Sequence, residues 1–205
     1  MLTSSAINKI NKLIETGYEN RQSSTSETGS ALFLKAWEFL AEFAPETYRD
    51  FTEVVAAYNQ NEDAYDWNGW IWEVVEELGH GAEDSTLNLD KRLHFIESFQ
   101  ERFPETSDES LMEYLQRFLI KTYFLLHRDA EGTAAVEAFY NRFDYSVWGY
   151  IAWADALLQR TETPTEMDKL RALEIYKQGL TVQDDPEFLD ILQNRIEKLE
   201  NQRNP

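Results

Sequence analysis

The sequence predicts an all-α protein, and three of its features carry that prediction. Apolar residues recur at intervals of three and four along most of the chain, which places them on one face of successive helices. No stretch shows the alternation of apolar and polar residues that marks a half-buried strand. The 205 residues include only 5 Pro and 8 Gly, as suits a helical protein. We therefore expect about ten helices and no sheet.

Five helices are predicted in the first half of the chain, each from an apolar stripe and from the breaks at its ends. Residues 20–28 are polar and rich in Ser and Thr, so we expect a loop there. Pro45 is expected to open the third helix, because its missing N–H is harmless in a first turn. Gly79 and Gly81 are expected to close the fourth helix. The five predicted ranges are 4–18, 29–44, 45–59, 65–78 and 88–103.

Five more helices are predicted in the second half. Residues 107–110 (Ser-Asp-Glu-Ser) open the sixth, whose apolar stripe continues to Leu126. Residues 129–132 (Asp-Ala-Glu-Gly) are interpreted as a turn, and the loop 161–164 precedes the ninth helix. Asp185 and Pro186 begin the tenth. The predicted ranges of the seventh, eighth and ninth helices are 133–143, 146–160 and 166–181.

One helical sequence pattern, called a phrase below, recurs along the chain. In its clearest form, Ala172, Tyr176, Gly179 and Leu180 share a helix face, on which small residues let a neighbouring helix approach and the ring fills the gap. The same spacing links three other sets: Gly29, Phe33, Ala36 and Trp37; Lys91, Phe95, Ser98 and Phe99; Ala135, Phe139, Arg142 and Phe143. Recurrence of a phrase every few tens of residues indicates a helical repeat array.

These phrases resemble the second helices of tetratricopeptide-type repeats, most closely within Trp148–Leu180. Longer pieces are similar to a bacterial group of tetratricopeptide-like proteins, some of which end in a small zinc-binding SEC-C module. These pieces are residues 33–38, 66–73, 91–95 and 147–155. The resemblance covers nearly the whole chain and implies a single domain, residues 1–205, forming a right-handed α-α superhelix with a concave face. The chain has no Cys, so we expect the zinc module to be absent.

Composition narrows the classes of function. The chain has 38 acidic and 19 basic residues, a formal net charge of −19. Like charges repel, which argues against binding to nucleic acid or to an anionic membrane. The absence of Cys excludes disulfides, thiolate metal sites and a Cys nucleophile. No apolar run has the length of a signal peptide or a membrane span, so we expect a soluble cytoplasmic protein.

We find no catalytic or cofactor motif, and we expect neither an active site nor a metal. Glu77 and His80 have a Glu-x-x-His spacing, but di-iron bundles need a second such pair. The favoured interpretation of the three glutamates on this helix is a solvated face; they are Glu73, Glu76 and Glu77.

Four residues are candidate binding residues: Trp72, Glu73, Glu76 and Asp155. Trp67, Trp70 and Ile71 are expected to face the core, which leaves Trp72 directed elsewhere, either against an adjacent repeat or as an interface anchor. Asp155 lies on an apolar stripe, where it either bonds a neighbouring helix end or contacts a ligand.

The predicted function is non-enzymatic binding of a protein or peptide, because repeat arrays bind through extended concave surfaces. If the negative charge forms an acidic groove, the partner is basic; otherwise the charge serves solubility. Two alternatives remain open. An acidic mimic of nucleic acid would carry carboxylates in rows over a convex surface, and an enzyme of unrecognised type would gather polar groups in a closed pocket.

Overall fold

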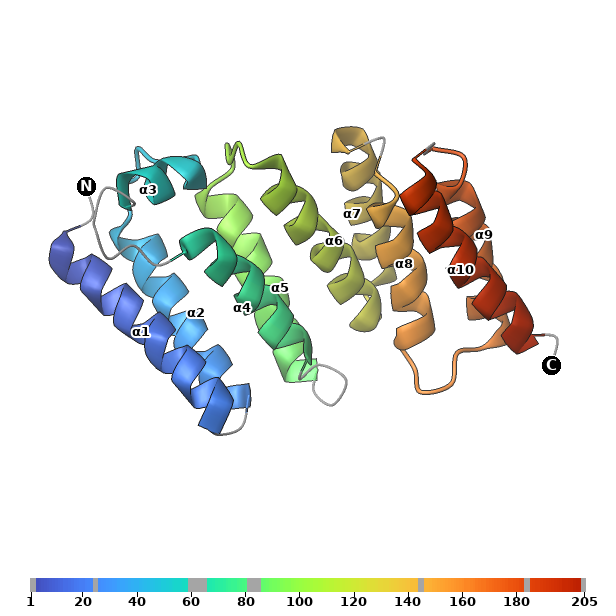
Figure 1. The fold of residues 1–205 in the computed structure, drawn as a ribbon, viewed down its shortest axis with the longest axis horizontal. Coiled ribbons are helices and arrows are strands. Elements are labelled where there is room, and N and C mark those ends of the chain that lie inside the picture. The colour runs from blue at the N-terminus through green and yellow to red at the C-terminus, as the bar shows by residue number, and fades with distance from the viewer. Residues whose placement is uncertain are drawn as a thin grey trace. The chain divides into compact units, whose positions relative to one another are not determined.

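The computed structural model describes residues 3–23, 26–58, 66–80, 86–143, 146–182 and 185–203. These residues form ten helices and no strand, which confirms the all-α prediction (Figure 1). The helices are α1 (Ser4–Ser23), α2 (Ser26–Phe43), α3 (Phe51–Tyr58), α4 (Trp67–His80), α5 (Thr86–Arg102), α6 (Glu109–Leu125), α7 (Asp129–Arg142), α8 (Trp148–Gln159), α9 (Glu166–Gly179) and α10 (Pro186–Arg203).

The chain divides into two compact units, unit 1 (Met1–Met112) and unit 2 (Glu113–Pro205), with the boundary inside α6. The single domain and the tetratricopeptide-like superhelix stay predictions. No helix in the described part of the chain is long and apolar enough to cross a membrane.

In unit 1, α1 and α2 form an antiparallel pair (Figure 1). The two helices approach closely because glycines lie between them: a Cβ on Gly17 would stand 2.5 Å from a ring carbon of Phe33, and one on Gly29 would stand 3.1 Å from the carbonyl oxygen of Gly17. The prediction of a loop over 20–28 is wrong for most of that segment, since α1 extends to Ser23 and α2 begins at Ser26. Polar composition suggested a loop, but helix-to-helix contact outweighs propensity in this hairpin.

The core of unit 1 is aromatic. The Trp37 ring is stacked on Phe99 at 5.4 Å and meets Phe95 edge-on at 5.3 Å, while its indole N–H donates to Ser98 Oγ. Phe51 and Phe103 extend this cluster. As predicted, Trp67, Trp70 and Ile71 are fully buried, whereas Trp72 is half-buried.

The C-terminal end of α2 is held by one arginine from α5. The Arg102 guanidinium donates to the carbonyl oxygens of Ala41 (3.2 Å), Ala44 (2.7 Å), Pro45 (2.9 Å) and Tyr48 (2.8 Å). These are carbonyls that a helix end leaves without a partner in the helix, together with those of the following turn. Burial lowers the pKa of Arg102 from its usual value.

The third helix does not begin at Pro45, contrary to the prediction. The helix starts at Phe51, after Asp50 accepts hydrogen bonds from the Thr52 amide (2.8 Å) and the Ser107 amide (3.2 Å). An Asp that accepts from amides of the first turn is a stronger start signal than a Pro, because it satisfies orphan donors.

Unit 2 contains most of α6 and the helices α7 to α10. The predicted turn at 129–132 is wrong, since these residues form the first turn of α7. The chain reverses just before them, where His127 has a φ of 56°. Gly132 lies inside α7. A glycine suits this position because a Cβ there would stand 2.9 Å from the Phe124 ring. In α9, Ala172, Tyr176 and Gly179 are buried on one face, as predicted.

Candidate functional site

A groove in unit 2 is a candidate site formed by described residues. It lies between α8, α9 and α10, which pack in that order, and its volume is about 560 Å³. Polar and apolar atoms contribute about equally to its lining, and three of the lining side chains are apolar. The lining residues are Asp155, Leu158, Gln159, Pro164, Tyr176, Asn194, Arg195, Lys198, Leu199 and Gln202.

Three of these residues, one from each helix, form a connected polar cluster. The Tyr176 hydroxyl donates to Asp155 Oδ1 at 2.5 Å. Arg195 donates to the same carboxylate through Nε (3.2 Å to Oδ1) and Nη2 (3.3 Å to Oδ2). Both carboxylate oxygens therefore have donors, and the two-point contact fixes the plane of the guanidinium.

Burial differs sharply across this cluster. Tyr176 is 2% exposed, whereas the side chains of Asp155 and Arg195 are 24% and 35% exposed. Burial, followed by the charge of Asp155, raises the pKa of the Tyr176 hydroxyl well above its usual value. The pKa of Arg195 is also raised: burial opposes the shift, but the bond to Asp155 outweighs it. Tyr176 stays neutral and Arg195 stays charged across the physiological pH range.

The rim of the groove is formed by exposed polar side chains. Asn194, Lys198 and Gln202 follow one another at intervals of four along α10, so they share one face of that helix. Gln159 lies across from them at the end of α8. The rim thus offers amides, which both donate and accept, and one ammonium group.

A capping box opens α9 directly after Pro164, which lines the groove. The Thr165 side chain accepts from the Asp168 amide at 3.1 Å, and Asp168 Oδ2 accepts from the Thr165 amide at 3.2 Å. Asp168 also pairs with Arg160, which follows α8. Burial alone would raise the pKa of Asp168, but the hydrogen bonds from Thr165 and Arg160 outweigh it, so the pKa is lowered. These contacts fix the α8–α9 connection that carries Pro164 into the groove.

The four predicted site residues fall into different units. Asp155 is in the groove of unit 2, whereas Trp72, Glu73 and Glu76 lie on α4 in unit 1. Asp155 bonds side chains of two neighbouring helices, Tyr176 in the last turn of α9 and Arg195 within α10.

The interpretation of the α4 glutamates as a solvated face is wrong for Glu77. Glu77 is 4% exposed and pairs with Arg21 Nε at 2.8 Å. Glu73 pairs with Arg21 Nη1 at 2.5 Å, and its side chain is 40% exposed. Trp72 and Glu76 are half-buried. Arg21 thus ties α1 to α4, and the carboxylates nearest to it serve the packing of unit 1.

The sequence did not indicate Arg195 or the groove. Tyr176 and Asp155 were both conspicuous, but for separate reasons, and Arg195 stands on a stretch of α10 rich in charged residues. A Tyr and an Asp on consecutive predicted helices, both on apolar stripes, were the available signal. Within the described residues, no three His, Asp or Glu side chains gather in a way that could hold a metal ion.

Comparison with family models, with curated proteins and with solved structures found no match to this chain. The resemblance to tetratricopeptide-like proteins therefore rests on the sequence phrases alone.

Proposed function

We propose that this protein is a non-enzymatic helical scaffold of the tetratricopeptide-like kind, which binds a segment of a partner protein in the groove between α8, α9 and α10. The single observation that supports this best is the groove itself. It combines a fixed polar floor with a rim of side chains that can hydrogen-bond, and its volume of about 560 Å³ suits a few residues of a peptide.

The chemistry of the rim supports a peptide as the ligand. A peptide backbone presents both N–H donors and C=O acceptors, and the side-chain amides of Gln159, Asn194 and Gln202 can meet both. Leu158 and Pro164 add apolar surface against which a side chain of the partner can pack. Such a surface recognises an extended segment by hydrogen bonds and contact area.

The polar floor supports a binding role and not a catalytic one. A general base needs a lone pair and a pKa near the working pH. Asp155 already accepts bonds from Tyr176 and Arg195 on both oxygens. Tyr176 stays neutral and Arg195 stays charged, so neither of these two groups exchanges a proton near neutral pH, and the bonds to Asp155 position Arg195 in the groove.

Selection of displayed random peptides against the purified protein tests this proposal. Asn194→Trp places a large ring in the groove from an exposed position, and Gln193→Trp places the same ring on the neighbouring exposed position outside the lining. We expect peptides selected on the wild type to bind the Asn194 variant at least about tenfold more weakly, a loss of about 1.4 kcal/mol, and the Gln193 variant equally well. If the selection yields no peptide, or if both variants bind like the wild type, the groove is not the binding site.

A further inference from the structure

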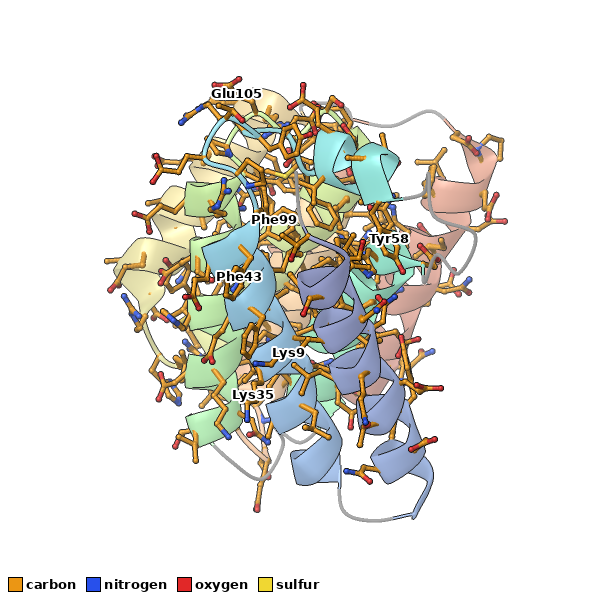
Figure 2. All side chains as sticks on the ribbon, turned by 90° about the vertical axis from the view of Figure 1, so that its left-hand side faces the viewer. Lys9, Lys35, Phe43, Tyr58, Phe99 and Glu105 are labelled. Atoms are coloured by element: carbon orange, nitrogen blue, oxygen red, sulfur yellow. The ribbon has the colours of Figure 1, made fainter. Side chains whose placement is uncertain are left out.

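Unit 1 carries a second feature that the groove does not use, an exposed pair of phenylalanines on α2. Phe39 and Phe43 lie one turn apart with their rings nearly parallel, at 7° and 5.7 Å between centroids. Phe39 is half-buried, whereas Phe43 is 47% exposed. Figure 2 shows Phe43 on the side of unit 1 that faces the viewer, with Lys9 and Lys35 below it in that view.

One ring of this pair already holds a cation. The Lys9 ammonium of α1 lies 3.7 Å from the centre of the Phe39 ring. An aromatic face carries partial negative charge and attracts a cation placed above it. The exposed Phe43 ring is the next member of the same stack, and it leaves nearly half of its surface open to solvent.

Two carboxylates flank Phe43 in the chain, while Lys9 and Lys35 lie further along the same side of unit 1. Glu42 precedes Phe43, and Glu46 follows in the turn after the helix; both are exposed. The charge of the whole unit has the same sign, because residues 1–112 contain 22 acidic and 8 basic side chains, a net charge of −14. Such a field raises the rate at which a positively charged partner arrives.

We propose that the exposed face of Phe43 binds an arginine of a basic partner segment, whose guanidinium stacks on the ring and bonds to Glu42 or Glu46. Arginine suits this site better than lysine, because the planar guanidinium stacks on a ring while its edge donates to carboxylates. This surface lies in unit 1 and is distinct from the groove in unit 2, so the two proposed binding sites can be tested independently.

Three labelled peptides of equal length test the proposal, with arginine, lysine or citrulline at every third position and alanine elsewhere. Fluorescence anisotropy measures their affinity for the full chain. We expect the arginine peptide to bind more tightly than the lysine peptide, and the uncharged citrulline peptide to bind most weakly. In Phe43→Ala the affinity for the arginine peptide should fall about threefold to fivefold, as for loss of one exposed cation–π contact.

Two further variants separate stacking from general attraction. Phe43→Tyr keeps an aromatic face and should bind as the wild type does. Leu87→Ala removes another exposed apolar side chain of unit 1, which is 56% exposed, and should leave affinity unchanged. Equal binding of the arginine peptide to wild type and Phe43→Ala overturns the proposal, and so does equal binding of all three peptides. A dimer in sedimentation that Phe43→Ala abolishes would assign the surface to a second copy and would also overturn it.

Discussion

The two units of this protein are both helical, yet they differ in what occupies the space between the helices. In unit 1, the helices meet through rings, with Trp37 in contact with Phe95 and Phe99. In unit 2, the α8–α9–α10 contact contains a chain of polar groups from Tyr176 through Asp155 to Arg195. Their net charges also differ, at −14 for unit 1 and −5 for unit 2, which has 16 acidic and 11 basic residues.

This difference indicates how each unit could bind a partner. Packed rings stabilise mainly by burial and carry no charge, so the core of unit 1 places no demand on the charge of its surface. Polar groups between helices cost desolvation unless every partner is in place, but they fix positions closely. Unit 1 therefore offers a charged surface, and unit 2 offers a groove with a fixed floor.

The largest expected effect tests the aromatic core of unit 1. Trp37→Ala removes contacts with Phe95, Phe99 and Phe103, and should reduce the free energy of unfolding by roughly 4 kcal/mol. Urea unfolding followed by circular dichroism measures the loss. Trp72→Ala, at a half-buried position, should cost clearly less. Similar losses in both variants would contradict the claim that Trp37 centres the core.

Tyr176 tests the polar floor of unit 2. Tyr176→Ala should cost about 3 kcal/mol, as truncation of a buried ring does. Tyr176→Phe keeps the ring and removes only the bond to Asp155, so it should cost about 1 kcal/mol. Thermal and urea unfolding of the two variants separate ring packing from the hydrogen bond. If the Phe variant were as unstable as the Ala variant, the hydroxyl would matter more than the ring.

Gly179 tests the close approach of α9 to its neighbours. A Cβ at this position would stand 3.1 Å from Leu192 Cδ1 and 3.2 Å from Tyr150 Cβ. Gly179→Leu should therefore cost about 2 kcal/mol by overpacking. Gln178→Leu, on the exposed side of the same helix, should change stability by less than about 0.5 kcal/mol. Equal stability of the two variants would show that α9 is not packed through its small residues.

The smallest expected effect concerns pH. The pKa of Asp168 is lower in the folded protein than its usual value of 3.8. Its contribution to stability is therefore fully present above pH 4 and is lost as the pH falls through the folded pKa. Asp168→Asn should cost about 1 kcal/mol at pH 7 and progressively less below pH 4. Unfolding curves across that range measure the difference, and a constant difference would exclude the carboxylate as its source.

Sequence reasoning succeeded where a stripe and its end signals agree. The helix predicted over 88–103 is observed at Thr86–Arg102, and the last helix begins at Pro186 as predicted. It failed at 20–23, 26–28 and 129–132, because polar residues, and Gly132 in the last segment, suggested breaks there. Gly132 is instead a helical residue that lets a neighbour approach. Helix propensity includes the cost of glycine in a helix, but it does not include packing against a helix that is distant in sequence.

The site was predicted only in part for a related reason. Asp155 was identified because a carboxylate on an apolar stripe is unusual. Arg195 was not, because a charged residue on the polar side of a helix looks the same whether it faces water or a groove. Glu77 was predicted to be solvated but is buried, because it pairs with Arg21, more than fifty residues earlier in the chain. Pairings between distant charged residues need the packing of the helices before they can be assigned.

The contacts of Arg102 have a consequence for the order in which unit 1 folds. The four carbonyls that it binds lie 54 to 61 residues earlier in the chain, so α2 and the following turn gain these donors only after α5 has docked. Contacts of such high sequence separation form late, because a long loop must close first. We therefore expect the C-terminal end of α2 to fray in a chain that lacks α5, and the docking of α5 to supply the missing donor.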